Sequence, residues 1–171
     1  MHKILVLGSS GSGKSTFARQ LGQALNIPVI HLDSHYWLPN WTSTPEEAWE
    51  KKILNLLQQD QWVMDGNYTS SLALRLKYAD TAIFLDVNRT VCLMRCFYRL
   101  AQNWGQNRQE LATGCYEKMD WDFFQWIWTY PRRRKPMILE TLKEYQADKQ
   151  TFVLKRDQIA RFIAEQRMDV C

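Results

Sequence analysis

The chain has 171 residues, of which 46% are hydrophobic and 23% are charged, and its formal net charge is +4. This composition excludes an intrinsically disordered protein, and no apolar run approaches the roughly 18 residues of a membrane span. The four cysteines include no CxxC pair and indicate neither a zinc site nor a disulfide framework, so we expect a cytoplasmic protein with no membrane partner.

Short apolar runs alternate with helical patterns along the chain, which is typical of a parallel α/β sheet covered by helices. Predicted strands cover residues 3–7, 28–32, 61–64, 81–86 and 151–154. Predicted helices cover residues 14–25, 45–59, 70–77, 89–103, 121–130, 136–147 and 157–167. We therefore expect one domain built as a three-layer, doubly wound, five-stranded parallel sheet.

Local signals refine three helix ends. Thr44 is interpreted as the N-cap of the helix over 45–59, with Pro45 in its first turn. The helix over 121–130 is expected to end before Pro131, because proline disfavours helical geometry in the preceding residue. Asp86 is interpreted as a structural cap of the helix that begins near Arg89.

The segment Gly8-Ser9-Ser10-Gly11-Ser12-Gly13-Lys14-Ser15 matches GxxxxGK[ST] at every required position and lies between a predicted strand and a predicted helix. Gly8, Gly11 and Gly13 give the loop a conformation in which backbone N–H groups point inward around phosphates. The N–H groups of Ser10 and Ser12 are expected to take part in this binding. Lys14 is expected to reach the β- and γ-phosphates, Ser15 to bind Mg²⁺, and Thr16 to approach the α-phosphate. This motif predicts binding of ATP with Mg²⁺.

Three acidic residues follow predicted strands whose carboxyl ends meet at the edge where ligands bind in such sheets. Asp65 is the candidate magnesium-binding and catalytic aspartate. Asp33 is the candidate that positions or deprotonates an acceptor hydroxyl, although a loop-anchoring role fits its position equally well. Asn67 follows Asp65 closely and is predicted to contact substrate.

Arginines are expected to grip phosphate oxygens around this edge. Arg75 is the candidate for an acceptor phosphate or carboxylate, and Arg132 is the candidate catalytic arginine. The remaining candidates belong to a lid predicted over about 104–134 and to the helix leading into it; they are Arg95, Arg99, Arg108 and Arg133.

Aromatic residues gather in two places. Tyr36 and Trp37, together with Trp41 and Trp49, are predicted to form an apolar wall beside the acceptor. The spacing of Trp121, Phe124 and Trp128 indicates one helix face packed on the core. A metal-binding pair is one interpretation of His31 and His35, but positions in the core or at the rim of the site fit these residues better.

The chain resembles the bacterial DNA topology modulation proteins, within the adenylate-kinase-like P-loop kinases. The segments that carry the resemblance are GSSGSGKST (8–16), HLDSHYW (31–37), WVMDGNY (62–68), ADTAIFLD (79–86) and WIWTYPRRR (126–134). The resemblance implies the strand order 2-3-1-4-5, a helical acceptor-side insertion over about 34–60, and an arginine-bearing lid.

The resemblance leaves the acceptor open. Nucleotide kinases carry a DGFPR segment whose arginine holds the acceptor phosphate, whereas this chain reads DGNYTSS from Asp65 and offers Arg75 as the nearest arginine. Asp33 is similar in place to the acceptor-hydroxyl aspartate of kinases for shikimate or gluconate.

Two functions remain in competition. The first is a kinase that transfers a phosphoryl group from ATP to a small acceptor, either a nucleotide or a hydroxyl metabolite. The second is an ATPase or regulator that acts with nucleic acid, which rests on the basic run over 132–135, the aromatic residues and the family resemblance. A GTP switch is disfavoured because no NKxD-type segment is present. The sequence does not predict the oligomeric state.

Overall fold

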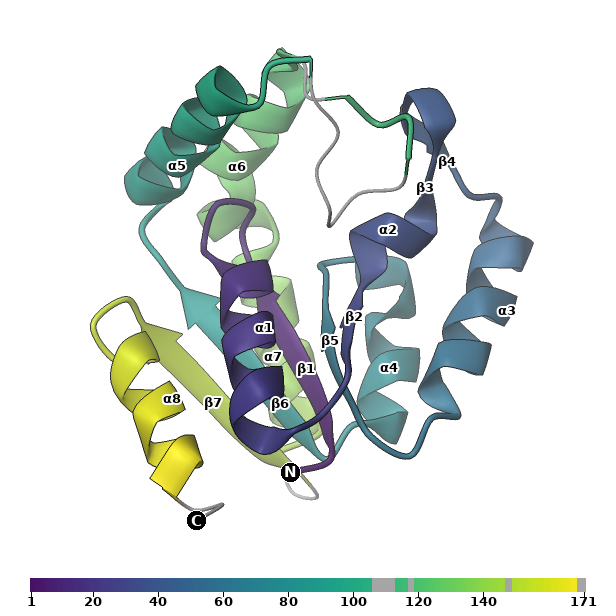
Figure 1. The fold of residues 1–171 in the computed structure, drawn as a ribbon, viewed down its shortest axis with the longest axis vertical. Helices are drawn as coiled ribbons and strands as arrows, with labels where there is room; N and C mark the ends of the chain where they lie inside the picture. The colour runs from purple at the N-terminus through teal and green to yellow at the C-terminus, as the bar shows by residue number, and fades with distance from the viewer. Residues whose placement is uncertain (106–112, 117–118, 147–148, 169–171) are drawn as a thin grey trace.

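The computed structural model describes residues 1–105, 113–116, 119–146 and 149–168. A five-stranded parallel sheet forms its centre (Figure 1). The strands are β1 (Lys3–Gly8), β2 (Val29–His31), β5 (Trp62–Asp65), β6 (Thr81–Asp86) and β7 (Gln150–Lys155). Their spatial order is β2-β5-β1-β6-β7, which corresponds to 2-3-1-4-5 when only these five are counted along the chain, so the expected order is confirmed.

Helices cover both faces of this sheet. They are α1 (Lys14–Leu25), α2 (Leu32–Tyr36), α3 (Glu46–Leu57), α4 (Leu72–Tyr78), α5 (Arg89–Gln102), α6 (Trp121–Arg133), α7 (Lys135–Glu144) and α8 (Ile159–Met168). Short 3-10 turns, η1 (Pro39–Trp41) and η2 (Thr69–Ser71), lie between them, and a two-stranded hairpin pairs β3 (Trp37–Leu38) with β4 (Thr42–Ser43). In Figure 1, α1 and α8 lie on one face and α3, α4 and α7 on the other.

The alternation of strand side chains divides the core into two layers. Ile4 and Val6 of β1 pack toward α1 and α8, whereas Leu5 and Leu7 pack toward α3, α4 and α7. All four side chains are fully buried, as a central parallel strand requires. A third cluster joins α5 to α6 through Cys92, Cys96 and neighbouring apolar residues, and both cysteines are buried in it.

Two expectations for the segment after β2 are wrong. The strand expected to reach residue 32 ends at His31, and residues 32–36 form the short helix α2, which was not predicted. Pro45 is the residue that precedes α3, and the hydroxyl of Thr44 donates instead to the carbonyl oxygen of Tyr36. Thr44 therefore ties the hairpin to α2 rather than capping α3.

The expectation for α6 is also wrong, because the helix continues through Pro131 to Arg133. Pro131 lacks the N–H that would bond to the carbonyl oxygen of Ile127, but α6 continues to Arg133, and Arg134, which also has helical φ/ψ values, links it to α7. Tyr130 and Ile127 are buried beside Phe124, and this packing outweighs the local cost of the proline.

The buried stripe of α6 differs from the one expected. Phe124 is buried, but Trp121 is 72% exposed and Trp128 is 46% exposed. The guanidinium of Arg89 lies 3.8 Å from the centre of the Trp128 ring and covers one of its faces. The buried residues of α6 are instead Phe124, Ile127 and Tyr130, spaced three apart.

Asp86 does not cap α5. The side chain of Asn88 accepts from the backbone N–H of Thr90 and serves as the N-cap. Both oxygens of Asp86 lie 2.7 Å from Nζ of Lys135, so this carboxylate joins the end of β6 to the start of α7.

Candidate active site

The phosphate-loop motif forms a tight turn between β1 and α1 that requires glycine. Gly8, Gly11 and Gly13 have φ values of 143°, 76° and 97°, in the region that side chains disfavour. A Cβ atom on Gly11 would lie 2.3 Å from the carbonyl oxygen of Cys92. A Cβ atom on Gly13 would have only the Arg95 guanidinium within 4 Å, so this side of the loop is open.

Lys14 begins α1, together with Ser15 and Thr16, and projects over the loop. Its Nζ donates to the carbonyl oxygen of Ser9 at 3.0 Å. Burial lowers the pKa of Lys14, whereas the carboxylates of Asp65 and Asp33 act to raise it. Lys14 therefore lies close enough to both Asp65 and Asp33 for their charges to interact.

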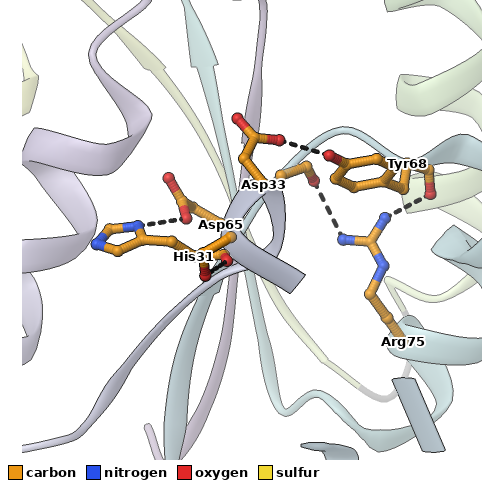
Figure 2. A network of polar contacts seen from close by, with 7 residues as sticks. His31, Asp33, Asp65, Tyr68 and Arg75 are labelled. Atoms are coloured by element: carbon orange, nitrogen blue, oxygen red, sulfur yellow. Dashed lines mark hydrogen bonds and ion pairs between the residues drawn. The ribbon is translucent and has the colours of Figure 1, made fainter. Parts of the chain in front are cut away.

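Asp65 is held by a histidine that the sequence analysis did not assign to the site. Asp65 ends β5 and is only 4% exposed, and His31 ends the neighbouring strand β2 in register with it. Nδ1 of His31 lies 2.7 Å from Oδ1 of Asp65 (Figure 2). The positions of both residues at the ends of adjacent parallel strands were the signal that could have revealed the pair.

Asp33 lies in α2, and its exposed carboxylate faces Tyr68. The hydroxyl of Tyr68 donates to Oδ1 of Asp33 at 2.6 Å, and Figure 2 shows the two side chains turned toward each other. Tyr68 is the second residue of the site that the sequence analysis missed. Its signal was the DGNY segment itself, in which Tyr68 stands three residues after Asp65.

Arg75 is buried and bonds to the protein's own backbone. It is 0% exposed, and its guanidinium donates to the carbonyl oxygens of Gly66 at 3.1 Å and Tyr68 at 2.7 Å, and to the hydroxyl of Ser71 at 3.2 Å. Burial lowers its pKa to about 10, so the side chain remains charged near neutral pH. The expectation that Arg75 grips an acceptor is therefore corrected: its donors hold the backbone of the segment after β5.

Asn67 contacts the phosphate loop. Its Oδ1 accepts from the backbone N–H of Gly8 at 3.3 Å. The side chain predicted to contact substrate thus ties the segment after β5 to the start of the motif.

The aromatic residues predicted for the acceptor side form one continuous set of ring contacts. Tyr36, Trp49 and Tyr68 contact one another with ring centres 4.5–5.0 Å apart. Trp49 is buried and belongs to the core rather than to an open wall. The ring centre of Trp37 lies 4.9 Å from that of Tyr36 and 5.5 Å from that of Trp41, so Trp37 connects the two parts of the set.

The arginines predicted for the lid occupy different positions. Arg95 approaches the phosphate loop, with Nη1 3.2 Å from the carbonyl oxygen of Ser12, whereas Arg99 lies one turn further along α5. Arg132 and Arg133 are exposed on the last turn of α6. Arg108 lies outside the described residues.

The next two residues of the basic run point inward instead. Arg134 donates to the hydroxyl of Thr69 at 3.3 Å, and Lys135 pairs with Asp86. Arg134 was not among the arginines predicted for the site, and its contact with the segment after β5 makes it the better placed member of the run.

Residues 113–116, which lie inside the predicted lid, form hydrogen bonds with the β3–β4 hairpin segment. The backbone N–H of Asn40 donates to Gly114 at 3.0 Å, and Nε1 of Trp41 donates to the carbonyl oxygen of Tyr116 at 2.8 Å. Residues 113–116 and the β3–β4 hairpin therefore border the acceptor side together (Figure 1).

The described residues contain no cluster of three or more His, Cys, Asp or Glu side chains that could hold a metal ion. Mg²⁺ is usually held by one or two protein ligands together with phosphates and water. Ser15 and Asp65 remain the predicted ligands. Among the described residues, every helix is too short or too polar to cross a bilayer.

Solved structures with the same fold include two kinases of known substrate. Shikimate kinase from Acinetobacter baumannii, solved with shikimate, has a TM-score of 0.61 at 16% identity, covering 99% of this chain and 92% of that one. A gluconokinase from Sinorhizobium meliloti has a TM-score of 0.55 at 20% identity, covering 98% and 90%. The chain has the fold of these kinases.

Sequence comparison adds one relative. The chain is 28% identical over 155 residues to YqaC, an uncharacterized protein of Bacillus subtilis strain 168, covering 89% of this chain and 86% of YqaC. No family model matches the chain. The resemblance to DNA topology modulation proteins therefore stays an expectation.

Proposed function

We propose that the protein transfers the γ-phosphoryl group of ATP to a hydroxyl group of a small acceptor. The observation that carries this proposal is that Lys14 of the phosphate loop interacts electrostatically with both Asp33 and Asp65. The kinase fold supports it, because P-loop proteins hold triphosphates at this strand–loop–helix junction.

The glycine loop and the start of α1 supply the triphosphate site. Its backbone N–H groups, with Lys14, offset the charge of the phosphates, and Thr16 lies at the same helix end. Ser15 and Asp65 would hold Mg²⁺, which neutralises charge on the phosphates when it is bound. His31 orients the carboxylate of Asp65 through the 2.7 Å contact.

Asp33 receives the proton in this proposal. The acceptor oxygen attacks the γ-phosphorus while the bond to the β–γ bridging oxygen breaks, ADP leaves, and the acceptor proton passes to Asp33. Arg95, beside the loop, and Arg134, beside Thr69, are the arginines best placed to contact phosphate oxygens. Arg99, Arg132 and Arg133 keep their predicted role at the lid side.

A hydroxyl acceptor is favoured over a nucleoside monophosphate. Asp33 presents a negative charge on the acceptor side, and the donors of Arg75 are directed to the protein's own backbone. Tyr36 and Trp37 offer apolar surface for the rest of the acceptor.

The experiment is a measurement of ADP release with MgATP and a panel of hydroxy acids, including shikimate and gluconate, beside nucleoside monophosphates. We expect a hydroxyl compound to stimulate ADP release, and Lys14→Ala to abolish that stimulation. Stimulation by monophosphates alone, or none by any compound, would contradict the proposal.

A nucleic-acid-dependent ATPase is the second candidate, and one observation favours it. Tyr98, Trp121 and Trp128 are exposed, and the guanidinium of Arg89 lies 3.8 Å from the centre of the Trp128 ring. Exposed aromatic rings and arginines stack on bases and contact phosphates. Fluorescence anisotropy with labelled single-stranded DNA at rising salt tests it. Salt-dependent binding that stimulates ATP hydrolysis would support this candidate, and its absence would remove it.

A further inference from the structure

The segment that follows β5 contacts three parts of the site that are distant in sequence. Successive residues bond to the phosphate loop, to the acceptor aspartate and to the start of α7. The contacts are Asn67 with Gly8 at 3.3 Å, Tyr68 with Asp33 at 2.6 Å, and Thr69 with Arg134 at 3.3 Å. The same short segment therefore sets the relative positions of the donor and acceptor sides.

The buried guanidinium of Arg75 forms hydrogen bonds with the segment over residues 66–71. It donates to the carbonyl oxygen of Tyr68 (Figure 2), to that of Gly66 and to the hydroxyl of Ser71. A planar group with several donors in fixed directions restrains such a turn better than a single hydrogen bond does. The backbone position of Tyr68 is thereby determined by Arg75.

The ring of Tyr68 is restrained as well. It lies between Tyr36, whose ring centre is 4.5 Å away, and Trp49, whose ring centre is 5.0 Å away. The only described partner of its hydroxyl is Asp33, and burial together with the negative charge of Asp33 raises the pKa of the phenol. The hydroxyl therefore remains a donor throughout the ordinary pH range.

We propose that Tyr68 is a positioning residue that holds Oδ1 of Asp33, so that Oδ2 is the oxygen turned to the acceptor. A carboxylate on a short helix at the protein surface is otherwise free to rotate about its side-chain bonds. Because misplacement of a catalytic group by about 1 Å can cost a hundredfold in rate, fixing this rotation has a direct effect on transfer. The inference rests on the proposed role of Asp33 and adds Tyr68 as a second functional residue on the acceptor side.

The variant Tyr68→Phe tests the inference because it removes the hydroxyl and keeps the ring. Tyr78→Phe is the matched control, since Tyr78 is a partly buried tyrosine at the end of α4, away from Asp33. ADP release is measured with MgATP alone, where water is the acceptor, and with shikimate or gluconate added. Asp33→Asn and the double variant complete the set, and thermal unfolding of each variant is recorded.

We expect Tyr68→Phe to lower kcat by about tenfold or more, with the KM for MgATP and the unfolding midpoint close to those of the wild type. In the Asp33→Asn background the same change should have no further effect, because Tyr68 acts through Asp33. Tyr78→Phe should match the wild type in every measurement.

Three results would overturn the inference in different ways. If Asp33→Asn lowers kcat but Tyr68→Phe does not, the positioning role fails and the proposed function stands. If Asp33→Asn leaves kcat unchanged with all acceptors, the role of Asp33 in the proposed function fails, and the role of Tyr68 fails with it. An equal fold-loss from Tyr68→Phe with and without Asp33 would also exclude positioning of this carboxylate.

Discussion

At the residue scale, the conformation of the phosphate loop depends on glycine residues, which have no Cβ atom. Gly11 lies so close to α5 that any side chain would meet the backbone of Cys92 and the sulfur of Cys96. The loop is therefore shaped both by backbone torsion angles and by contact with a second helix. Local sequence explains the torsion angles, and only the tertiary structure explains the contact.

Gly11→Ala is predicted to distort the loop and weaken MgATP binding by about tenfold or more, because a contact of 2.3 Å forces the backbone or α5 to move. Gly105→Ala is the matched control: Gly105 also has a positive φ, of 67°, but nothing lies within 4 Å of its added Cβ. Isothermal titration with MgATP measures the difference. Equal affinities for the two variants would contradict the packing argument.

His35 links stability to pH on the acceptor side. Its pKa is lowered by burial and by the positive charge of Lys52, with a further contribution from His31. The unfolded chain therefore binds a proton more readily than the folded one, and the free energy of unfolding should fall as the pH drops through about 6.5. Urea denaturation between pH 8 and pH 5 should show a smaller fall for His35→Gln than for the wild type; identical slopes would remove this assignment.

At the element scale, α5 carries the side chains that meet the phosphate loop, so its start matters. Asn88 caps it by accepting from the backbone N–H of Thr90 at 2.9 Å. We predict that Asn88→Ala lowers the free energy of unfolding by about 1 kcal/mol. The control is Asn55→Ala, at an exposed position inside α3, which should leave the free energy of unfolding nearly unchanged. Chemical denaturation of both variants decides whether the cap contributes as stated.

Elements were predictable from sequence where pattern and tertiary packing agree. The strand over 81–86 matches β6 because it is a buried apolar run, and the glycine motif placed the start of α1. The course of α6 through Pro131 was not predictable, since burial of Tyr130 and Ile127 overrides the proline. The same limit applies to Thr44, whose hydroxyl bonds to a residue eight positions earlier.

The candidate site was predictable in its acidic and phosphate-binding residues but not in their partners. Asp33, Asp65 and Lys14 follow from strand ends and a spaced motif. The contacts of His31 and Tyr68 join residues more than 30 positions apart, so sequence patterns could mark these two residues but could not identify their partners. Arg75 was assigned to substrate because sequence shows its charge but not its burial.

At the scale of the whole molecule, the parallel sheet brings the ends of β1, β2 and β5 to one edge. The phosphate loop, Asp33 and Asp65 meet there although they lie far apart in the chain. The segment after β5 joins these parts to α7, while the β3–β4 hairpin and residues 113–116 border the acceptor side. In the proposed function, this arrangement places the triphosphate and the acceptor on neighbouring sides of the same sheet edge.

The most direct test of this account is ³¹P NMR of the product formed from MgATP and the hydroxyl and monophosphate panel. The account predicts ADP together with a phosphate monoester on a hydroxyl acceptor, with no such product from Lys14→Ala. Formation of a nucleoside diphosphate from a monophosphate acceptor, or of inorganic phosphate alone with every compound, would contradict it.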